Sequence, residues 1–413
     1  MKKRYVIILA MFIFFVVGCS NVEEGTATLN STEPSLTYPW MEGDSPVTAH
    51  RIGVIRAGVN NADHTISPSG VYYMCATESD DKTGDMVTYL LYSDYGSDTV
   101  IKLCGRADCN HENVDCNSYF ENGCNICYYN GYLYATSSYG SDCECILYRI
   151  DTDGNNRVEL FDFSQFAVEK NLDFAVCDMI DTGICYVTLY HWIEMEYEDG
   201  SKGLQAEAVE TYLYKVDGSM AAPVLMESEC GPLYHCGEVF LALKSGTQNG
   251  GFNGYDFSYW DYDPETDSIT YLTDHPGIAG FYGKEYGYYF RDGAVIRLNY
   301  ETRDEERIIE TDLSGSYYAK CFPDCIVIAS KESGANADKR LYIYNWGYEL
   351  VDIVSLSFLP EGLSAHRALI IETAERLILT SDSFSNIPKY YIEKSEIGSG
   401  DVKVHSFNLP DFQ

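Results

Sequence analysis

The chain has 413 residues, 46% of them in the AVILMFWYC set, so it is long enough for two domains or one large repetitive domain. This apolar fraction is typical of globular proteins and excludes wholesale disorder. The formal net charge is −35, from 63 Asp and Glu against 28 Lys and Arg, which excludes general affinity for nucleic-acid backbones and for anionic lipid surfaces.

The N-terminus has the pattern of a bacterial lipoprotein signal peptide. A basic start (KKR, residues 2–4) precedes an apolar run over residues 5–17 that is short for a membrane span, and Gly18 then stands before Cys19. We interpret residues 1–18 as the signal and Cys19 as the lipidated residue; the alternative is a short anchor helix with an incidental cysteine. Two acyl chains hold a protein stably on a membrane, so we expect an extracytoplasmic, lipid-anchored protein of the cell envelope.

Residues 19–50 predict a flexible tether. Beyond Cys19 they are polar and small, with scattered Pro and no apolar period. No later stretch reaches 18 apolar residues, so we expect no further membrane span. Residues 51–413 are then left as the folded domain.

A short phrase recurs through residues 51–413. It is an apolar, aromatic strand that begins at a small turn, and it returns roughly every 50 residues, the spacing of repeat folds. Its seven occurrences are SGVYYMC from Ser69, NGYLYAT from Asn130, TGICYVTL from Thr182, CGEVFLAL from Cys236, EYGYYFR from Glu285, PDCIVIAS from Pro323 and AERLILTS from Ala374. A second strand with an acidic or Gly turn follows each phrase, a third follows most, and another strand precedes each.

Four strands per unit predict an all-β fold, a β-propeller of seven blades. Six blades, with one unit misread, and a pair of β-sandwiches are the alternatives. The abundance of Tyr (36) and Gly (34) agrees with strands and turns, and only residues 164–170 predict a helical turn or two. Residues 51–56 (RIGVIR) could complete the last sheet or cap the first.

Signal, tether and the repeated N-G-Y-L-Y … L-Y-x-I-D-x-D-G phrases together resemble the TolB-like β-propeller lipoproteins that bacteria export. The resemblance covers nearly the whole chain after the signal. It implies a propeller fold, and a role in binding or scaffolding rather than one shared chemistry.

The densest group of chemically capable residues has the pattern C-x4-C-x-H-x4-C between the first two units, in Cys104, Cys109, His111 and Cys116. Four such ligands could close a tetrahedral structural zinc site. A disulfide across the loop is the competing expectation for an exported protein, and unpaired thiols are the third. Each bonded form would staple a long loop, and zinc would have four protein ligands with no open coordination position.

Other cysteines and one acidic turn invite weaker interpretations. Three cysteine pairs flank turns between successive strands and could bridge hairpins, or could be small buried residues: Cys177 and Cys185, Cys230 and Cys236, Cys321 and Cys325. The segment Asp151–Asn155 resembles the opening of a calcium loop but lacks its later ligands, so we interpret it as a hairpin turn.

No catalytic signature is present in the sequence: it has no G-x-S-x-G, H-E-x-x-H or G-x-x-x-x-G-K-[ST]. Aromatic segments around Trp192, Tyr255 and Trp260 predict ligand-facing loops. We therefore expect a membrane-anchored propeller that binds a protein, a peptidoglycan-type polymer or a glycan, with no catalysis evident. The alternatives are a glycan hydrolase or lyase with acidic channel residues, and a metal- or redox-responsive sensor that uses residues 104–116.

Overall fold

The structure is a computed structural model. It describes residues 64–78, 86–121, 123–137, 144–180, 183–196, 202–225, 233–236, 239–245, 257–263, 268–273, 286–299, 301–322, 324–381 and 387–412. The chain divides into two units, residues 1–34 and 35–413, and every described residue belongs to the second. The predicted signal peptide, Cys19, the tether and the strand expected at residues 51–56 lie outside the described residues. Within the described ranges, no helix has the length and apolar character that a membrane crossing needs.

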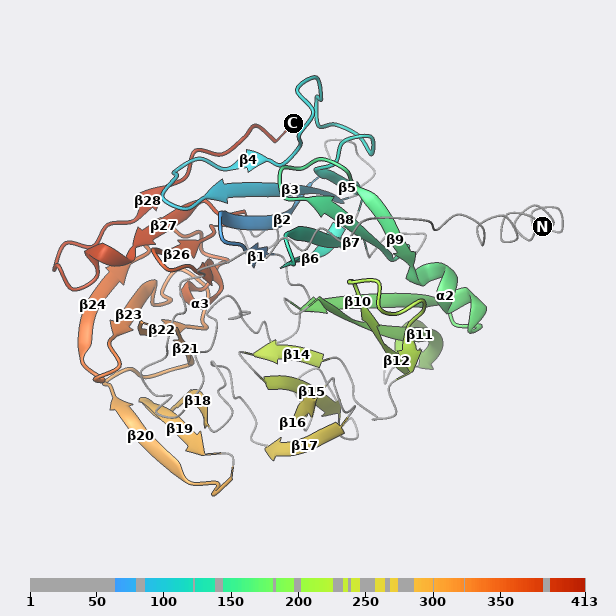
Figure 1. Ribbon diagram of the computed structural model, residues 1–413. Helices are drawn as coiled ribbons and strands as arrows, with labels where there is room; N and C mark the ends of the chain where they lie inside the picture. The colour runs from blue at the N-terminus through green and yellow to red at the C-terminus, as the bar shows by residue number, and fades with distance from the viewer. Residues whose placement is uncertain are drawn as a thin grey trace, which may run out of the picture. The chain divides into compact units, whose positions relative to one another are not determined.

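The described strands form seven antiparallel sheets that follow one another along the chain, from blue to red in Figure 1. We number them in chain order. Sheet 1 holds β1 (His64–Ile66), β2 (Gly70–Glu78), β3 (Met86–Asp94), β4 (Ile101–Lys102) and β5 (Tyr119–Glu121); sheet 2 holds β6 (Gly123–Tyr129), β7 (Tyr132–Ser137), β8 (Ile146–Asp151) and β9 (Val158–Asp162); sheet 3 holds β10 (Phe174–Ile180), β11 (Ile184–Glu196), β12 (Lys202–Lys215) and β13 (Val224–Leu225). Sheet 4 holds β14 (Leu233–Cys236), β15 (Val239–Ser245), β16 (Phe257–Asp263) and β17 (Ser268–Thr273); sheet 5 holds β18 (Tyr286–Arg291), β19 (Ala294–Asn299) and β20 (Glu305–Glu310); sheet 6 holds β21 (Tyr317–Cys321), β22 (Ile326–Ser330), β23 (Arg340–Tyr344) and β24 (Leu350–Ser355); sheet 7 holds β25 (Leu369–Glu372), β26 (Arg376–Leu379), β27 (Tyr390–Glu393) and β28 (His405–Ser406).

The recurring phrase takes the same place in six of these sheets. It forms the second strand in sheets 1, 2, 3, 4, 6 and 7, and the first described strand, β18, in sheet 5. The segment before β18 lies outside the described residues. The prediction of repeated four-stranded antiparallel sheets, each resembling a propeller blade, is confirmed at this level.

The recurring strands are almost continuously apolar because both of their faces are buried. In β2, Tyr72 and Met74 pack against sheet 2, whereas Val71 and Tyr73 pack against sheet 7. Side chains alternate between faces along a strand, so neighbouring residues contribute to two different cores. Each of these four side chains is at most 3% exposed.

Buried clusters join consecutive sheets and also join the last sheet to the first. Separate clusters link sheets 1 and 2, 2 and 3, 5 and 6, and 6 and 7. A fifth cluster links sheet 7 to sheet 1, with Ile371 and Tyr391 on one side and Tyr73 and Leu91 on the other. Face-to-face packing of small sheets, with contact between the two ends of the series, is the packing scheme of propeller blades.

Helical structure is sparse in the described residues. The turn expected at residues 164–170 is present as α2 (Phe163–Glu169), whose N-cap Asp162 accepts a hydrogen bond from the Gln165 backbone N–H. The structure also has α3 (Ala365–Ala368) and a 3-10 turn, η2 (Lys394–Glu396), which the sequence analysis did not predict.

Candidate metal centre

The outer edge of sheet 1 is interrupted by a loop. Both β4 and β5 pair with β3, so two short strands share the place of one outer strand. The loop between them, residues 103–118, begins and ends beside the same residue of β3, Leu90. The Leu103 N–H donates to the Leu90 carbonyl at 2.8 Å, and the Leu90 N–H donates to the Ser118 carbonyl at 2.8 Å. The strand fixes the ends of the loop, so its interior depends on its own side chains.

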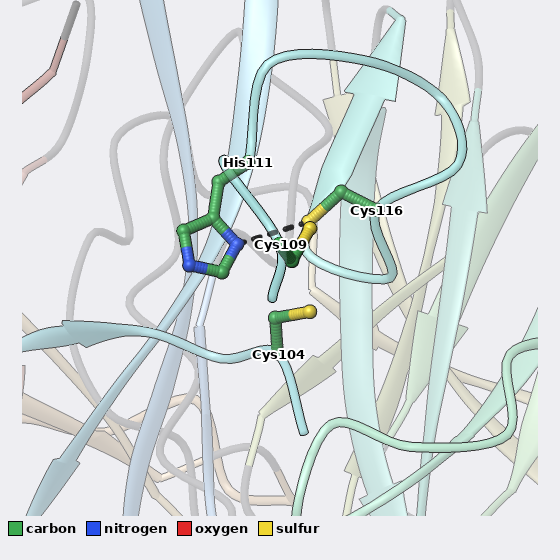
Figure 2. Close-up of side chains that lie close together, drawn as sticks. All are labelled: Cys104, Cys109, His111 and Cys116. Atoms are coloured by element: carbon green, nitrogen blue, oxygen red, sulfur yellow. Dashed lines mark hydrogen bonds between the residues drawn. The ribbon is translucent and has the colours of Figure 1, made fainter. Parts of the chain in front are cut away.

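Four side chains of this loop point toward one another: Cys104, Cys109, His111 and Cys116 (Figure 2). Their ligand atoms all lie within 4.8 Å of one another, and Nδ1 of His111 is 3.2 Å from Sγ of Cys116. Zinc–sulfur bonds of about 2.3 Å and zinc–nitrogen bonds of about 2.0–2.1 Å place tetrahedral donor atoms about 3.5–3.8 Å apart. The four donors therefore fit a tetrahedral zinc ion after shifts of an ångström or less.

The local backbone explains how so short a segment gathers four ligands. The loop contains two hydrogen-bonded turns. In one the Cys109 N–H donates to the Arg106 carbonyl, and in the other the Cys116 N–H donates to the Asn113 carbonyl. Between these turns, His111 has a φ of 62°, in the left-handed region that few side chains adopt. This conformation turns the imidazole back toward the thiols.

The protonation states of the ligands differ with their surroundings. Burial raises the pKa of Cys116 to about 11 although Ser118 hydrogen-bonds its sulfur. Burial also opposes ionisation of Cys109, but hydrogen bonds from the His111 backbone and from its two neighbouring thiols outweigh it and lower the Cys109 pKa. Burial and the nearby Lys102 lower the pKa of His111, which favours the neutral imidazole that a metal requires.

Arg157, directly before β9 of the neighbouring sheet 2, holds the end of the loop. Its guanidinium donates to the carbonyl oxygens of Val114 (2.7 Å), Cys116 (3.1 Å) and Tyr119 (2.7 Å). It also stacks 4.9 Å from the ring centre of Phe120. A cation this close stabilises negative charge on the Cys116 sulfur, as the next shell of groups around a metal commonly does.

The β8–β9 turn supports the other end of the loop. It is the acidic segment that resembled a calcium loop, and its backbone bonds confirm a hairpin turn, with the Gly154 N–H on the Asp151 carbonyl at 2.9 Å. The Gly154 carbonyl accepts from the Gly105 N–H (3.3 Å) and from the Asn117 side chain (2.8 Å). A Cβ at Gly154 would lie 2.8 Å from the Leu103 carbonyl, so only glycine allows this contact.

In the structure Cys104, Cys109 and Cys116 form no disulfide. Cys185 and Cys325, which could have bridged hairpins, also form no disulfide and are buried. They behave as the small apolar residues that the sequence analysis gave as the alternative. Cys230, of the third pair, lies outside the described residues.

Of the three aromatic residues expected in ligand-facing loops, two lie in strands and one lies outside the described residues. Trp192 lies in strand β11, in a ribbon with β12 that extends past the end of β10, and it is 41% exposed. Trp260 lies in strand β16, where its backbone pairs with Ala242. Tyr255 lies outside the described residues. For Trp192 and Trp260, the loops that we expected are strands.

The groups that support the four ligands were not predicted from the sequence. Four strands, β5 to β8, separate Cys116 from Gly154 and Arg157, and no spacing rule connects them with it. The acidic turn was visible as a turn, but its contact with the loop depends on how sheets 1 and 2 pack.

Comparison with known proteins finds similarity of fold and nothing further. No protein-family model and no curated protein matches this sequence. Among solved structures, the β-propeller domain of the trilobed protease from Pyrococcus furiosus is similar at 6% identity and a TM-score of 0.42, over 81% of this chain and 89% of that one. A puromycin-hydrolysing peptidase from Mycobacterium tuberculosis is similar at 11% identity and a TM-score of 0.47, over 92% of this chain and 57% of the peptidase. An oligogalacturonate lyase from Vibrio parahaemolyticus is similar at 11% identity and a TM-score of 0.38, over 65% of this chain and 73% of the lyase.

Proposed function

We propose that this chain is an exported, lipid-anchored β-propeller that acts as a binding or scaffold module, and that residues 103–118 hold a structural zinc ion. The single observation that carries the metal assignment is the convergence of three thiols and one imidazole within 4.8 Å. Sulfur and imidazole donors in a tetrahedral set are the usual ligands of structural zinc. The ion would close a loop that has no regular secondary structure of its own.

The wider assignment rests on the N-terminal pattern and the fold. We infer that Cys19 is acylated, that the chain is a TolB-like propeller of seven blades closed by packing of sheet 7 on sheet 1, and that it faces the outside of the membrane. A protein, a peptidoglycan-type polymer or a glycan is its proposed partner. A pull-down of envelope polymers and surface proteins with the purified protein tests this part, and capture of no partner contradicts it.

The metal assignment is tested by elemental analysis and thiol counting on the purified protein. We expect one zinc per chain in the wild type and loss of zinc in Cys116→Ala. The matched control is Cys185→Ala, which removes an equally buried thiol outside the loop and should keep its zinc. A metal-free wild type with two thiols fewer than the sequence provides would identify a disulfide instead.

A second candidate function, a metal- or redox-responsive sensor, is favoured by the exposure of the ligands. Cys116 is buried, but Cys104, Cys109 and His111 are each partly exposed. Exposed thiolates are open to exchange and oxidation, which a purely structural site would avoid. Zinc that a chelator removes within minutes from the folded protein would favour the sensor, and zinc that stays bound until unfolding would favour the scaffold.

A further inference from the structure

A cavity of about 560 Å³ lies directly beside the candidate metal centre. We call residues 103–118 the metal loop. The walls of the cavity are residues 99–102 at the edge of sheet 1, residues 110–112 of the metal loop, and residues 408–411 near the C-terminus. Sites for small molecules commonly have volumes of about 300–1,000 Å³. The cavity is therefore large enough to hold a small ligand.

His111 belongs both to the metal centre and to the cavity. Its Nδ1 lies 3.2 Å from the Cys116 sulfur, and His111 is one of the residues that line the cavity. Cys116 is buried and hydrogen-bonded by Ser118, and the three cysteines are not among the residues that line the cavity, whereas His111 is. His111 is thus the ligand that a molecule in the cavity can reach and replace.

The charges of the wall restrict what this molecule can be. Lys102 offers one ammonium group, placed 4.2 Å from the ring centre of Tyr89, which would offset a new negative charge at the metal. Glu112 and Asp411 also line the cavity and oppose any further negative charge. Soft thiolate sulfur is also a preferred ligand of zinc.

We propose that the cavity binds a small, uncharged thiol, which replaces His111 as the fourth ligand of the metal. This inference rests on the metal centre proposed above. The thiol releases its proton to solvent as the bond between His111 and the metal breaks and a metal–sulfur bond forms, and His111 is left as a neutral imidazole. No electrons are transferred, so no oxidant or reductant is needed.

The test uses the purified protein loaded with Co²⁺, whose absorption spectrum reports sulfur ligands. We expect three-sulfur absorption in the wild type, and a rise to four-sulfur absorption when 2-mercaptoethanol is added. Mercaptoacetate, which carries a carboxylate, should be at least tenfold less effective. In His111→Ala, which leaves the fourth position open, 2-mercaptoethanol should act at concentrations at least tenfold lower than in the wild type.

A cavity-filling variant separates binding in the cavity from reaction with the metal through solvent. Ile101 lines the cavity, is 47% exposed and ligates nothing, so Ile101→Trp should fill the space and abolish the response to the thiol. Its cobalt spectrum without thiol serves as the check on folding. An unchanged spectrum in both the wild type and His111→Ala, or release of cobalt into solution by the thiol, overturns the inference. Absence of any cobalt–sulfur absorption overturns the metal centre itself.

Discussion

Glu372 is a buried carboxyl group at the contact between sheets 6 and 7. It is 7% exposed and forms an ion pair with Lys394, whose ammonium group also lies 2.6 Å from Asp324. Burial raises the pKa of Glu372 to about 7, against the attraction of Lys394. Burial alone would lower the Lys394 pKa, but the two carboxylates raise it. The carboxyl group thus stays partly protonated near neutral pH in the folded chain.

The raised pKa of Glu372 predicts that the stability of the fold depends on pH through this residue. The folded-state pKa of Glu372 lies above its unfolded value, so the stabilising contribution is complete below about pH 4.5 and is lost as the pH rises to about 7. We expect the unfolding free energy, measured with urea, to fall over this range in the wild type. Each unit of pKa shift corresponds to about 1.4 kcal/mol. In Glu372→Gln the fall should be smaller by this contribution.

The matched control for this prediction is Glu393→Gln. Glu393 also lies on sheet 7 and pairs with a cation, Arg376, at 2.8 Å, but its side chain is 27% exposed. The control should keep the wild-type dependence between pH 4.5 and 7. Equal slopes in the wild type and Glu372→Gln would contradict the assignment of the pH dependence to Glu372.

At the scale of elements, the metal loop depends on a turn from another sheet. Gly154 has a φ of 80°, and a Cβ there would press on the Leu103 carbonyl at 2.8 Å, directly before Cys104. We predict that Gly154→Ala destabilises the chain and also lowers its affinity for zinc at least tenfold, because the loop backbone must move. Urea unfolding and competition with a chelator measure the two effects.

Gly218 provides the control for Gly154. It has a nearly identical φ of 78° in another turn, but a Cβ there meets nothing within 4 Å. Gly218→Ala should therefore carry the backbone strain alone, about 1 kcal/mol or somewhat more, without loss of zinc affinity. If both variants bind zinc as the wild type does, the turn does not position the ligands.

Some features of these elements could be predicted from the sequence, and others could not. The four metal ligands lie within residues 104–116, so local spacing was enough to predict that they could meet. Arg157 could not be predicted, since its role depends on the packing of sheet 2 against sheet 1. The β11–β12 ribbon was mistaken for a loop because its outer part carries Glu, Lys and Gly among aromatics, whereas cross-strand pairing from His191 to Glu196 keeps it extended.

At the scale of the whole folded unit, the repeated phrase predicted the series of sheets because each phrase supplies a strand buried on both faces. The contact between the first and last sheets was not predictable from it. Residues 51–56 were one candidate for that contact, and they lie outside the described residues. Among the described strands, no sheet combines segments from both ends of the chain. The two sheets are joined instead by side-chain packing and by a short bridge between Thr99 and Asn408.

Arg376 is the charged group at this contact. Its side chain is 8% exposed, it pairs with Glu393 at 2.8 Å, and it lies 4.1 Å from the ring centre of Tyr391. The same guanidinium donates to the carbonyl of Ser97, which lies between β3 and β4. One side chain of sheet 7 thereby holds the segment that leads into the bridge, where the Val100 N–H donates to the Asn408 carbonyl at 2.9 Å.

We predict that Arg376→Met loosens both ends of the folded unit together. Removing one partner of a largely buried ion pair costs about 3 kcal/mol or more, whereas removing a surface partner costs about 0–1 kcal/mol. The surface control is Arg307→Met, whose partner Glu310 is 76% exposed. Hydrogen–deuterium exchange should become faster at residues 97–101 and 407–409 in Arg376→Met and stay unchanged there in the control. Faster exchange confined to β26 would show that Arg376 supports its own sheet alone, and that the packed core carries the contact between the two ends without it.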